Sequence, residues 1–253
     1  MIDWLVIILI PVTTAILAQI FKFSLLTEVL LFFGASPLYL FIRNSKIIKK
    51  VVLFSLIPWW PLTIIWEYLG YVDKSWFVQS THRFLSNSLP LEDIPWGILF
   101  VVYVLAVWEY FFNKSKVKGQ LFSARIYVLA GFLYGMLLLF LIPYFLAPSL
   151  LVVPYFFLWL GILFCIIPLV LFLSRNPQFL PLLIKMSLYF FLPFSLMDFT
   201  ALTRRQWWFP GTHFMGTINF FGQILPGEEI LFFWILCAPA LVCWYEFFAN
   251  GEK

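Results

Sequence analysis

Charged residues are scarce in this sequence. Of its 253 residues, 11% are Asp, Glu, Lys or Arg and 63% are hydrophobic. A soluble domain carries about 25% charged residues, so this chain could not cover a water-exposed surface, and a soluble fold is excluded. The net charge of +4 rests on few residues. It indicates orientation in a membrane and not a surface that binds nucleic acid.

Cysteine and aspartate are scarce as well. The three cysteines lie in apolar segments without metal-type spacing, so we expect buried thiols and no metal site. The four aspartates form no Asp-x-x-x-Asp cluster, which argues against an enzyme that binds a metal-diphosphate. Gly-rich breaks in the apolar segments, typical of transporter half-helices, are not evident. This weakens the interpretation as a transporter and leaves it open.

Long apolar runs, in contrast, are abundant. A membrane helix needs about 20 apolar residues, and eight stretches qualify, which predicts an all-α transmembrane helix bundle. The first pair is separated only by Lys22–Ser24, so seven spans stay open as an alternative. The predicted spans are Ile2–Phe21, Leu25–Ile42, Val51–Tyr71, Ile94–Phe112, Ile126–Leu146, Leu150–Leu173, Leu180–Leu202 and Ile230–Phe248.

The basic residues between these spans divide unevenly. One side holds Arg43, Lys46, Lys49, Lys50, Lys114, Lys116, Lys118, Arg125, Arg175, Lys185 and Lys253; the other holds Lys22, Lys74, Arg83, Arg204 and Arg205. Loops rich in Lys and Arg stay in the cytoplasm. We therefore expect a multi-pass protein of the cell membrane with both termini in the cytoplasm.

An internal repeat divides the chain. An acid precedes a Trp by nine residues twice, and a Pro precedes a Trp by 18 residues twice. The matching pairs are Glu67–Trp76 with Asp198–Trp207, and Pro90–Trp108 with Pro226–Trp244. This predicts two tandem modules, residues 1–118 and 119–253, with about four spans each. Equal orientation would bring all acidic motifs to one membrane face, opposite the basic loops.

The second half resembles a known family on these residues. Asp198 at a predicted helix end, Trp207-Trp208 and the block Pro226-Gly227-Glu228-Glu229-Ile230-Leu231-Phe232-Phe233 are similar to the modules of the integral-membrane lycopene cyclases of archaea, actinobacteria and fungi. The first half departs in having Glu67 in place of Asp and the shorter block Leu91-Glu92-Asp93. Gly227 replaces an aliphatic residue of the usual pattern.

The resemblance implies a non-redox reaction that converts lycopene end groups to rings, as in γ- or β-carotene. Such a reaction needs a proton donor, a shielded carbocation and a base, and it requires no cofactor or metal. Carboxylic acids in a dry pocket suit the proton steps, and Trp and Phe rings can stabilise a cation. The partners would be the carotenoid and membrane lipid, and a homo-oligomer is compatible. Candidate catalytic residues are Glu228, Glu229, Glu92, Asp93, Asp198 and Glu67, and candidate substrate-binding residues are Trp76, Trp207, Trp208, Phe232 and Phe233.

Simpler interpretations stand beside this hypothesis. Glu228, Glu229 and their first-half counterparts would be first-turn acids that favour a helix dipole. Asp198 would pair with Arg204 or Arg205, and the Trp residues would form an interfacial belt. Glu28, Glu109 and Glu246 are expected to reach solvent. For the whole chain, the alternative is a non-catalytic or transporter-like protein that binds isoprenoids or lipids.

Overall fold

The computed structural model describes residues 2–56, 60–84, 88–113, 121–220 and 222–251, and these residues are mostly helical. Within them, seven helices are long and apolar enough to cross a membrane. A further pair, Ser45–Leu56 and Trp60–Asp73, passes the same test only together and bends by 46°, which gives eight spans if the pair is one. The prediction of an all-α bundle with seven or eight spans is confirmed.

The spans agree closely with the predicted ranges, with two differences. The predicted span Val51–Tyr71 consists of two helices, and α5 begins at Trp60, where Pro61 suits a helix start. The predicted span Leu150–Leu173 begins only at Phe156, after a 3-10 turn at Pro148–Leu151. The helices in chain order are α1 (Ile2–Phe21), α2 (Leu25–Val29), η1 (Leu30–Gly34), α3 (Ala35–Arg43), η2 (Ser45–Ile47), α4 (Ile48–Leu56), α5 (Trp60–Asp73), α6 (Asp93–Val107), η3 (Trp108–Phe112), α7 (Arg125–Leu146), η4 (Pro148–Leu151), α8 (Phe156–Gly161), η5 (Ile162–Ile166), α9 (Ile167–Arg175), η6 (Pro177–Phe179), α10 (Leu180–Thr203), η7 (Glu229–Leu236), α11 (Cys237–Tyr245) and η8 (Glu246–Asn250).

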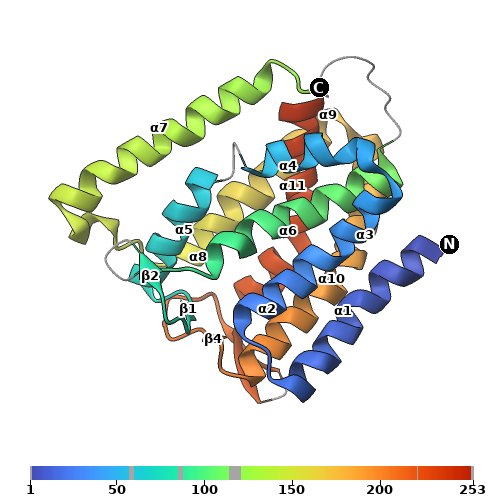
Figure 1. Cartoon of the computed structure of the whole chain (residues 1–253). Coiled ribbons are helices and arrows are strands. Elements are labelled where there is room, and N and C mark those ends of the chain that lie inside the picture. Colours follow the sequence, from blue (N-terminus) through green and yellow to red (C-terminus); the bar gives the residue numbers. More distant parts are fainter. Residues whose placement is uncertain (1, 57–59, 85–87, 114–120, 221, 252–253) are drawn as a thin grey trace.

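The centre of the bundle is formed by α6 and by the continuous span η7–α11 (Figure 1). More than half of each of these spans is buried, whereas only 22% of α1 and of α7 is buried. Helix α1 packs against α10, and α7 packs against α5, both on the outside of the bundle. The exposed faces of α1 and α7 are apolar, as lipid-facing helices require, since lipid is as apolar as these side chains.

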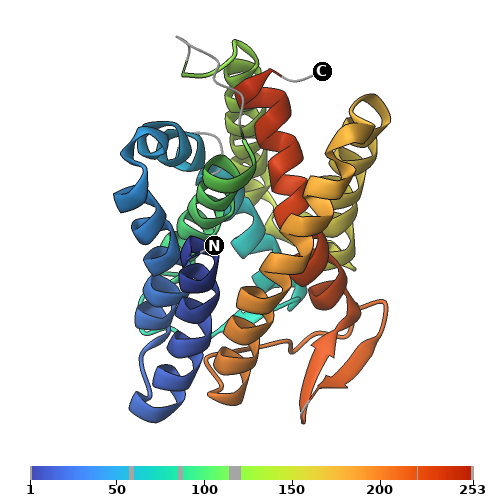
Figure 2. The ribbon, with the colours of Figure 1, turned by 90° about the vertical axis from the view of Figure 1, so that its right-hand side faces the viewer.

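Short strands gather at one end of the bundle, where Figure 2 shows them below the helices. Strands β2 (Arg83–Phe84) and β3 (Leu89–Pro90) form one antiparallel pair, and β5 (Thr217–Phe220) and β6 (Gln223–Pro226) form another. A third pair joins distant parts of the chain. In it, β1 (Phe77–Val78) runs antiparallel to β4 (Trp207–Trp208), with Phe77 opposite Trp208.

Helices α5 and α10, which lead into β1 and β4, end in the same way. Lys74 and Arg205 both adopt left-handed backbone conformations, with φ of 61° and 55°. The amide of the next residue, Ser75 or Gln206, donates to the carbonyl five residues earlier at 2.8 Å in both cases. The two chain segments therefore leave their helices along matching paths.

The spans that contain α3 and α9 match as well. Each contains a five-residue π-helical segment, η1 or η5, near its middle. Each ends at an asparagine, Asn44 or Asn176, whose amide donates to the carbonyl four residues earlier at 2.9 Å. A 3-10 turn follows each asparagine, Ser45–Ile47 or Pro177–Phe179. Corresponding positions in these two spans are 132 residues apart.

The central helices exchange polar contacts at the end of the bundle away from the strands. The Trp108 indole donates to Glu246 at 2.5 Å, and the Tyr245 hydroxyl donates to Glu109. The Lys50 ammonium lies 3.4 Å from Glu109. Glu246 is buried, so the expectation that these two glutamates are solvated is wrong for Glu246. Its carboxyl instead satisfies an indole that would otherwise be buried without a partner.

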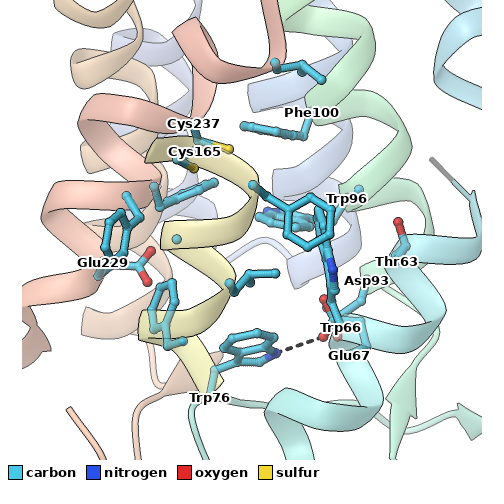
Figure 3. A pocket seen from close by; sticks show the side chains of 18 of the residues that line it. Thr63, Trp66, Glu67, Trp76, Asp93, Trp96, Phe100, Cys165, Glu229 and Cys237 are labelled. Carbon is cyan, nitrogen blue, oxygen red and sulfur yellow. Dashed lines mark hydrogen bonds between the residues drawn. The ribbon is translucent and has the colours of Figure 1, made fainter. Parts of the chain in front are cut away.

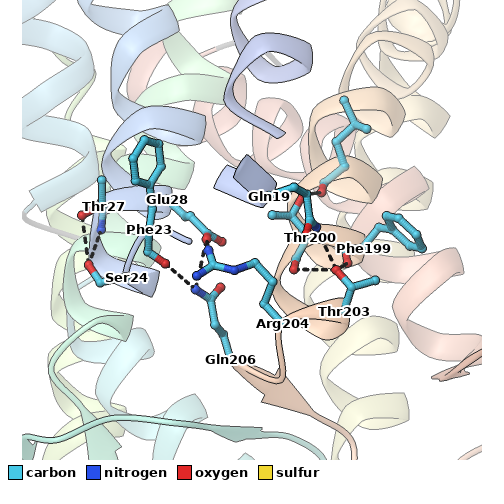
Figure 4. A network of polar contacts seen from close by, with 11 residues as sticks. Gln19, Phe23, Ser24, Thr27, Glu28, Phe199, Thr200, Thr203, Arg204 and Gln206 are labelled. Atoms are coloured by element: carbon cyan, nitrogen blue, oxygen red, sulfur yellow. Dashed lines mark hydrogen bonds and ion pairs between the residues drawn. The ribbon is translucent and has the colours of Figure 1, made fainter. Parts of the chain in front are cut away.

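A second polar network lies where α2 meets the end of α10 (Figure 4). The Glu28 side chain is fully buried and forms an ion pair with Arg204. The Gln206 amide donates to Glu28 and to the carbonyl of Phe23, both at 3.0 Å. The expectation that Glu28 reaches the membrane interface is wrong, because inside the bundle Arg204 compensates its charge and Gln206 donates a hydrogen bond to it.

Candidate functional site

A cavity of about 160 Å³ lies between α5, α6, α8–η5 and η7–α11, beside the β1–β4 pair. One water molecule takes about 10–15 Å³ on this scale, so the cavity has room for a sizeable apolar group. Its lining is almost entirely aromatic and aliphatic, and Figure 3 shows the side chains that surround it. The described aromatic residues that line it are Trp66, Trp76, Trp96, Phe100, Phe157, Phe164, Trp207, Phe209, Phe232, Phe233 and Trp244.

Four carboxyl groups are the main polar exception in this lining. They belong to Glu67, Asp93, Asp198 and Glu229, and all four side chains are buried. The carboxyl group of Glu67 lies beside that of Asp93, and the carboxyl group of Asp198 lies beside that of Glu229. Two carboxylates have only acceptors, so a hydrogen bond within a pair needs a proton on one partner. A pair that holds one proton therefore combines a proton donor and a proton acceptor.

Each carboxyl pair also receives an indole hydrogen bond. Trp76 donates to Glu67 at 2.9 Å, as the dashed line in Figure 3 shows. Trp234 donates to Asp198 at 2.5 Å. The nine-residue spacing therefore yields an acid–indole contact in the first half only. In the second half the donor comes from η7.

Glycine explains this difference between the halves. A Cβ at Gly70 would overlap the Trp76 ring, so Trp76 reaches Glu67 only because Gly70 has no side chain. The corresponding position in α10, 131 residues later, is Ala201. Ala201 is fully buried, and the Trp207 indole nitrogen has no hydrogen-bond partner within the described part of the chain. We infer that the Ala201 methyl group leaves no room there for an indole placed as Trp76 is.

The predicted acids fall into two groups by position. Asp93, Glu229, Asp198 and Glu67 come together at the cavity, whereas Glu92 and Glu228 are not among the described residues that line it. Glu228 is fully buried and accepts a hydrogen bond from the Met215 amide at 2.6 Å. Glu92 and Glu228 are the N-cap residues of their helices and make no side-chain capping hydrogen bond, and Asp93 and Glu229 lie in the first turns. These positions agree with the interpretation of all four as acids that favour a helix dipole.

The proposed pairing of Asp198 with an arginine is wrong for Arg204. That guanidinium contacts Glu28 on α2, while Asp198 is fully buried against Glu229 and Trp234. The direction of the Asp198 side chain decides this outcome. It points from α10 toward η7, away from the end of its own helix.

Among the predicted substrate-binding residues, Trp76, Trp207, Phe232 and Phe233 line the cavity. Trp208 lies outside the lining, and its half-exposed ring packs on Phe77 with 4.7 Å between ring centroids. The belt interpretation therefore fits the position of Trp208 better than those of Trp76 and Trp207. Phe232 and Phe233 bring aromatic faces to the cavity directly after Glu229.

Several lining residues escaped the sequence analysis, among them Trp66, Trp96, Phe100 and Phe164. Trp96 and Phe100 follow Asp93 by three and seven residues, so helical periodicity places all three on one face of α6. That signal was available. Trp66 and Phe164 come from different helices, and only the packing of α5 against α8–η5 brings their rings to 4.9 Å between centroids.

No protein-family model matches this chain, and no curated protein or solved structure matches it significantly. Within the described residues, no three His, Cys, Asp or Glu side chains are grouped as metal ligands would be. What the protein does is therefore inferred from the cavity and its two carboxyl pairs.

Proposed function

We propose that this protein is a membrane carotenoid cyclase that converts the end groups of lycopene, or of a related polyene, into rings without a redox change. One observation carries the proposal. Two pairs of neighbouring buried carboxyl groups, Glu67–Asp93 and Asp198–Glu229, line a single apolar cavity among membrane-type helices. A polyene is long and apolar, so such a cavity suits it and lipid can supply it.

The reaction can be balanced within one carboxyl pair. The protonated carboxyl donates its proton to the terminal alkene, and the resulting cation forms a carbon–carbon bond with a neighbouring alkene to close the ring. The ionised carboxyl then removes a proton from the carbon next to the new cation, which restores a double bond. No atom is gained or lost, and a proton shift along the carboxyl–carboxyl hydrogen bond resets the pair. A positioned acid and base of this kind contribute about 10²–10⁴-fold each to a rate.

The aromatic lining supports the cationic step. Trp76, Trp96 and Phe233 present rings to the same cavity as the acids. Aromatic faces attract a cation at close range but cannot trap it as a nucleophile would. The apolar surroundings also keep water from the cation. Both properties favour ring closure over hydration.

We further propose that residues 1–118 and 119–253 are two similar modules with the same orientation. The matching helix ends at Lys74 and Arg205 and the matching turns at Asn44 and Asn176 support this division. The pairing of β1 with β4 is what a pseudo-two-fold axis between two such modules would produce. The basic residues favour an arrangement with both termini in the cytoplasm and the strands on the opposite side.

The second candidate is a non-catalytic or transporter-like protein that binds an isoprenoid or a lipid. The apolar cavity favours it as much as it favours a cyclase, because binding alone needs no acid. The carboxyl pairs distinguish the two candidates. Buried carboxyl groups are costly, and a passive binding site for a hydrocarbon gains nothing from them.

Expression in lycopene-accumulating cells tests the proposal. Pigment chromatography is expected to show a ringed carotene. The matched control is the double variant Asp93→Asn, Glu229→Gln, which keeps the shapes of both pairs and is expected to leave lycopene unchanged. Membrane fractionation has to show equal amounts of both proteins. Unchanged lycopene with the wild-type protein present in the membrane would contradict the proposal, and bound but unchanged lycopene would favour the second candidate.

A further inference from the structure

The centre of the cavity is nearly symmetric between the two halves. Several cavity residues of the first half have a counterpart in the second half that also lines the cavity. The counterpart lies 131 positions later for residues of α5 and β1, and 136 positions later for residues of α6. These counterparts include Glu67 with Asp198, Trp76 with Trp207, and Asp93 with Glu229. A symmetric centre alone would suit a symmetric ligand equally well from either side.

One side of the cavity has no counterpart. It extends along α8–η5, where Leu160, Gly161 and Cys165 line it together with Thr63 of α5. We call this extension the α8 lobe. The corresponding positions on the other side, along α2–η1, lie 132 residues earlier. Within the described part of the chain, no residue of α2 or η1 lines the cavity.

Residue size explains why only one lobe is open. Val29 stands where the α8 lobe has Gly161, and Phe33 stands where it has Cys165. Both are essentially unexposed. The Phe33 ring packs edge-on against the ring of Phe194, at 6.1 Å between centroids, and Phe194 is the counterpart of the smaller Thr63. Larger side chains thus stand on the closed side. In the α8 lobe the Phe232 ring packs directly against Gly161, and the smaller Cys165 and Thr63 line the remaining space.

Polar contacts close the same side more firmly. Glu28 is the counterpart of Leu160, and its buried carboxylate is held by Arg204 and Gln206 (Figure 4). A ligand that entered between α2 and α10 would have to separate this ion pair. An apolar chain offers neither side chain a replacement for its partner, so its entry on this side is disfavoured. In the α8 lobe, by contrast, Leu160 and Gly161 offer an apolar wall.

We infer that the protein binds a long polyene in one direction, with one end group at the carboxyl pairs and the remaining chain in the α8 lobe. This inference rests on the proposed function and specifies its substrate geometry. One end group reacts per binding event. A polyene with two reactive ends therefore leaves as a product with one ring and has to bind again, reversed, to gain the second ring. Thr63 and Cys165 determine this specificity by being small, and Gly161 contributes by leaving room for the Phe232 ring.

Filling the lobe tests the inference. Cys165→Phe places in the lobe the side chain that Phe33 places on the closed side. The control is Leu163→Phe, which adds the same ring on the half-exposed face of the same segment. Cys165→Phe is expected to lower ring formation by about 10- to 200-fold, the range in which apolar pockets discriminate added bulk, and Leu163→Phe is expected to keep the wild-type rate. Equal rates in both variants would overturn the inference.

A binding measurement separates this inference from the proposed function. In the Asp93→Asn, Glu229→Gln background, quenching of tryptophan fluorescence by added lycopene reports binding without turnover, because Trp66 and Trp244 line the cavity. Cys165→Phe is expected to remove the quenching. Its removal without any ring formation by the wild type would refute the cyclase and retain the lobe. Quenching that persists would refute the lobe whether or not rings form.

Isotope dilution tests the release of the one-ring product. Membranes with wild-type protein receive labelled lycopene and an excess of unlabelled one-ring carotene. If the one-ring product leaves the cavity, the excess dilutes the label, and little label reaches the two-ring carotene. Two-ring carotene that carries the full label would show that both ends react without release, and the inference would fail.

Discussion

Phe77 lies directly opposite Trp208 in the antiparallel β1–β4 pair, and the two residues are counterparts 131 positions apart. When two similar segments pair antiparallel, residues that face their own counterparts mark a local two-fold axis. Val78 accordingly faces Trp207, and the amide of Gln79 donates to the carbonyl of Gln206 at 2.7 Å. The β1–β4 pair lies beside the cavity, so the proposed two-fold axis between the modules would bring acids from both halves to the same space.

The carboxyl pairs provide the first prediction. Glu229→Gln removes the proton-carrying group of the second pair with little change in shape, so we expect ring formation to fall by about 10²–10⁴-fold. Glu228→Gln keeps an oxygen that can accept the Met215 amide and lies outside the lining, so most of the activity should remain. Initial rates by pigment chromatography, normalised to membrane-inserted protein, compare the two. The assignment of Glu229 fails if both variants behave alike.

The contact between Gly70 and Trp76 provides the second prediction. Gly70→Ala places a methyl group in the space of the indole, so Trp76 should lose its bond to Glu67. Overpacking of this kind costs about 1–3 kcal/mol, and thermal unfolding in detergent should occur at a lower temperature. Wild-type protein is the reference for this comparison. A Gly70→Ala protein that unfolds at the wild-type temperature or above it would contradict the geometry.

The third prediction concerns the buried ion pair of Glu28 and Arg204. Arg204→Leu leaves the Glu28 carboxylate buried without its cation and should destabilise the protein by about 3–5 kcal/mol. In the double variant Glu28→Leu, Arg204→Leu the uncompensated charge is gone, and Glu28→Leu introduces the residue that its counterpart Leu160 provides. We expect the double variant to unfold at a higher temperature than the single one. The opposite order would show that the two side chains are not coupled.

Sidedness gives the fourth prediction. Arg175 should face the cytoplasm, and Ile218 on β5 should face the other side. Single cysteines at these two positions, labelled with a membrane-impermeant reagent in intact cells, should react only at position 218. The native thiols of Cys165, Cys237 and Cys243 lie in the spans, and the parent protein provides their background. Labelling at both positions from one side would refute the predicted orientation or span count.

The spans were predictable because apolar runs of the right length have few other uses. The repeat stays a prediction, which rests on the recurrence of acid, Trp and Pro at fixed offsets. The sequence could not predict which of two adjacent acids faces the cavity. Consecutive helical residues point about 100° apart, and only the rotation of α6 and η7 selects Asp93 and Glu229. The role of Trp234 also depends on packing, because it replaces Trp207 as the donor to Asp198 only where Ala201 stands in place of Gly70.

The burial of Glu28 and Glu246 shows the limit of reasoning from a single segment. Each lies on an apolar helix, where a lone glutamate is expected to reach toward water. Their partners, Arg204 and Trp108, come from distant parts of the chain. The hydropathy of a single segment does not predict such contacts. They follow from which helices become neighbours.

The exchanged bonds of Trp108 with Glu246 and of Tyr245 with Glu109 join the central helices at one end of the bundle, and β1 and β4 join the two halves at the other. Paired contacts thus join the chain at both ends of the bundle, and on the proposed function we expect the polyene to enter and leave the cavity sideways between helices. Supply and removal of the occupant then depend on its lateral movement in the bilayer. Stiffening the acyl chains should slow turnover even when every side chain at the cavity is unchanged.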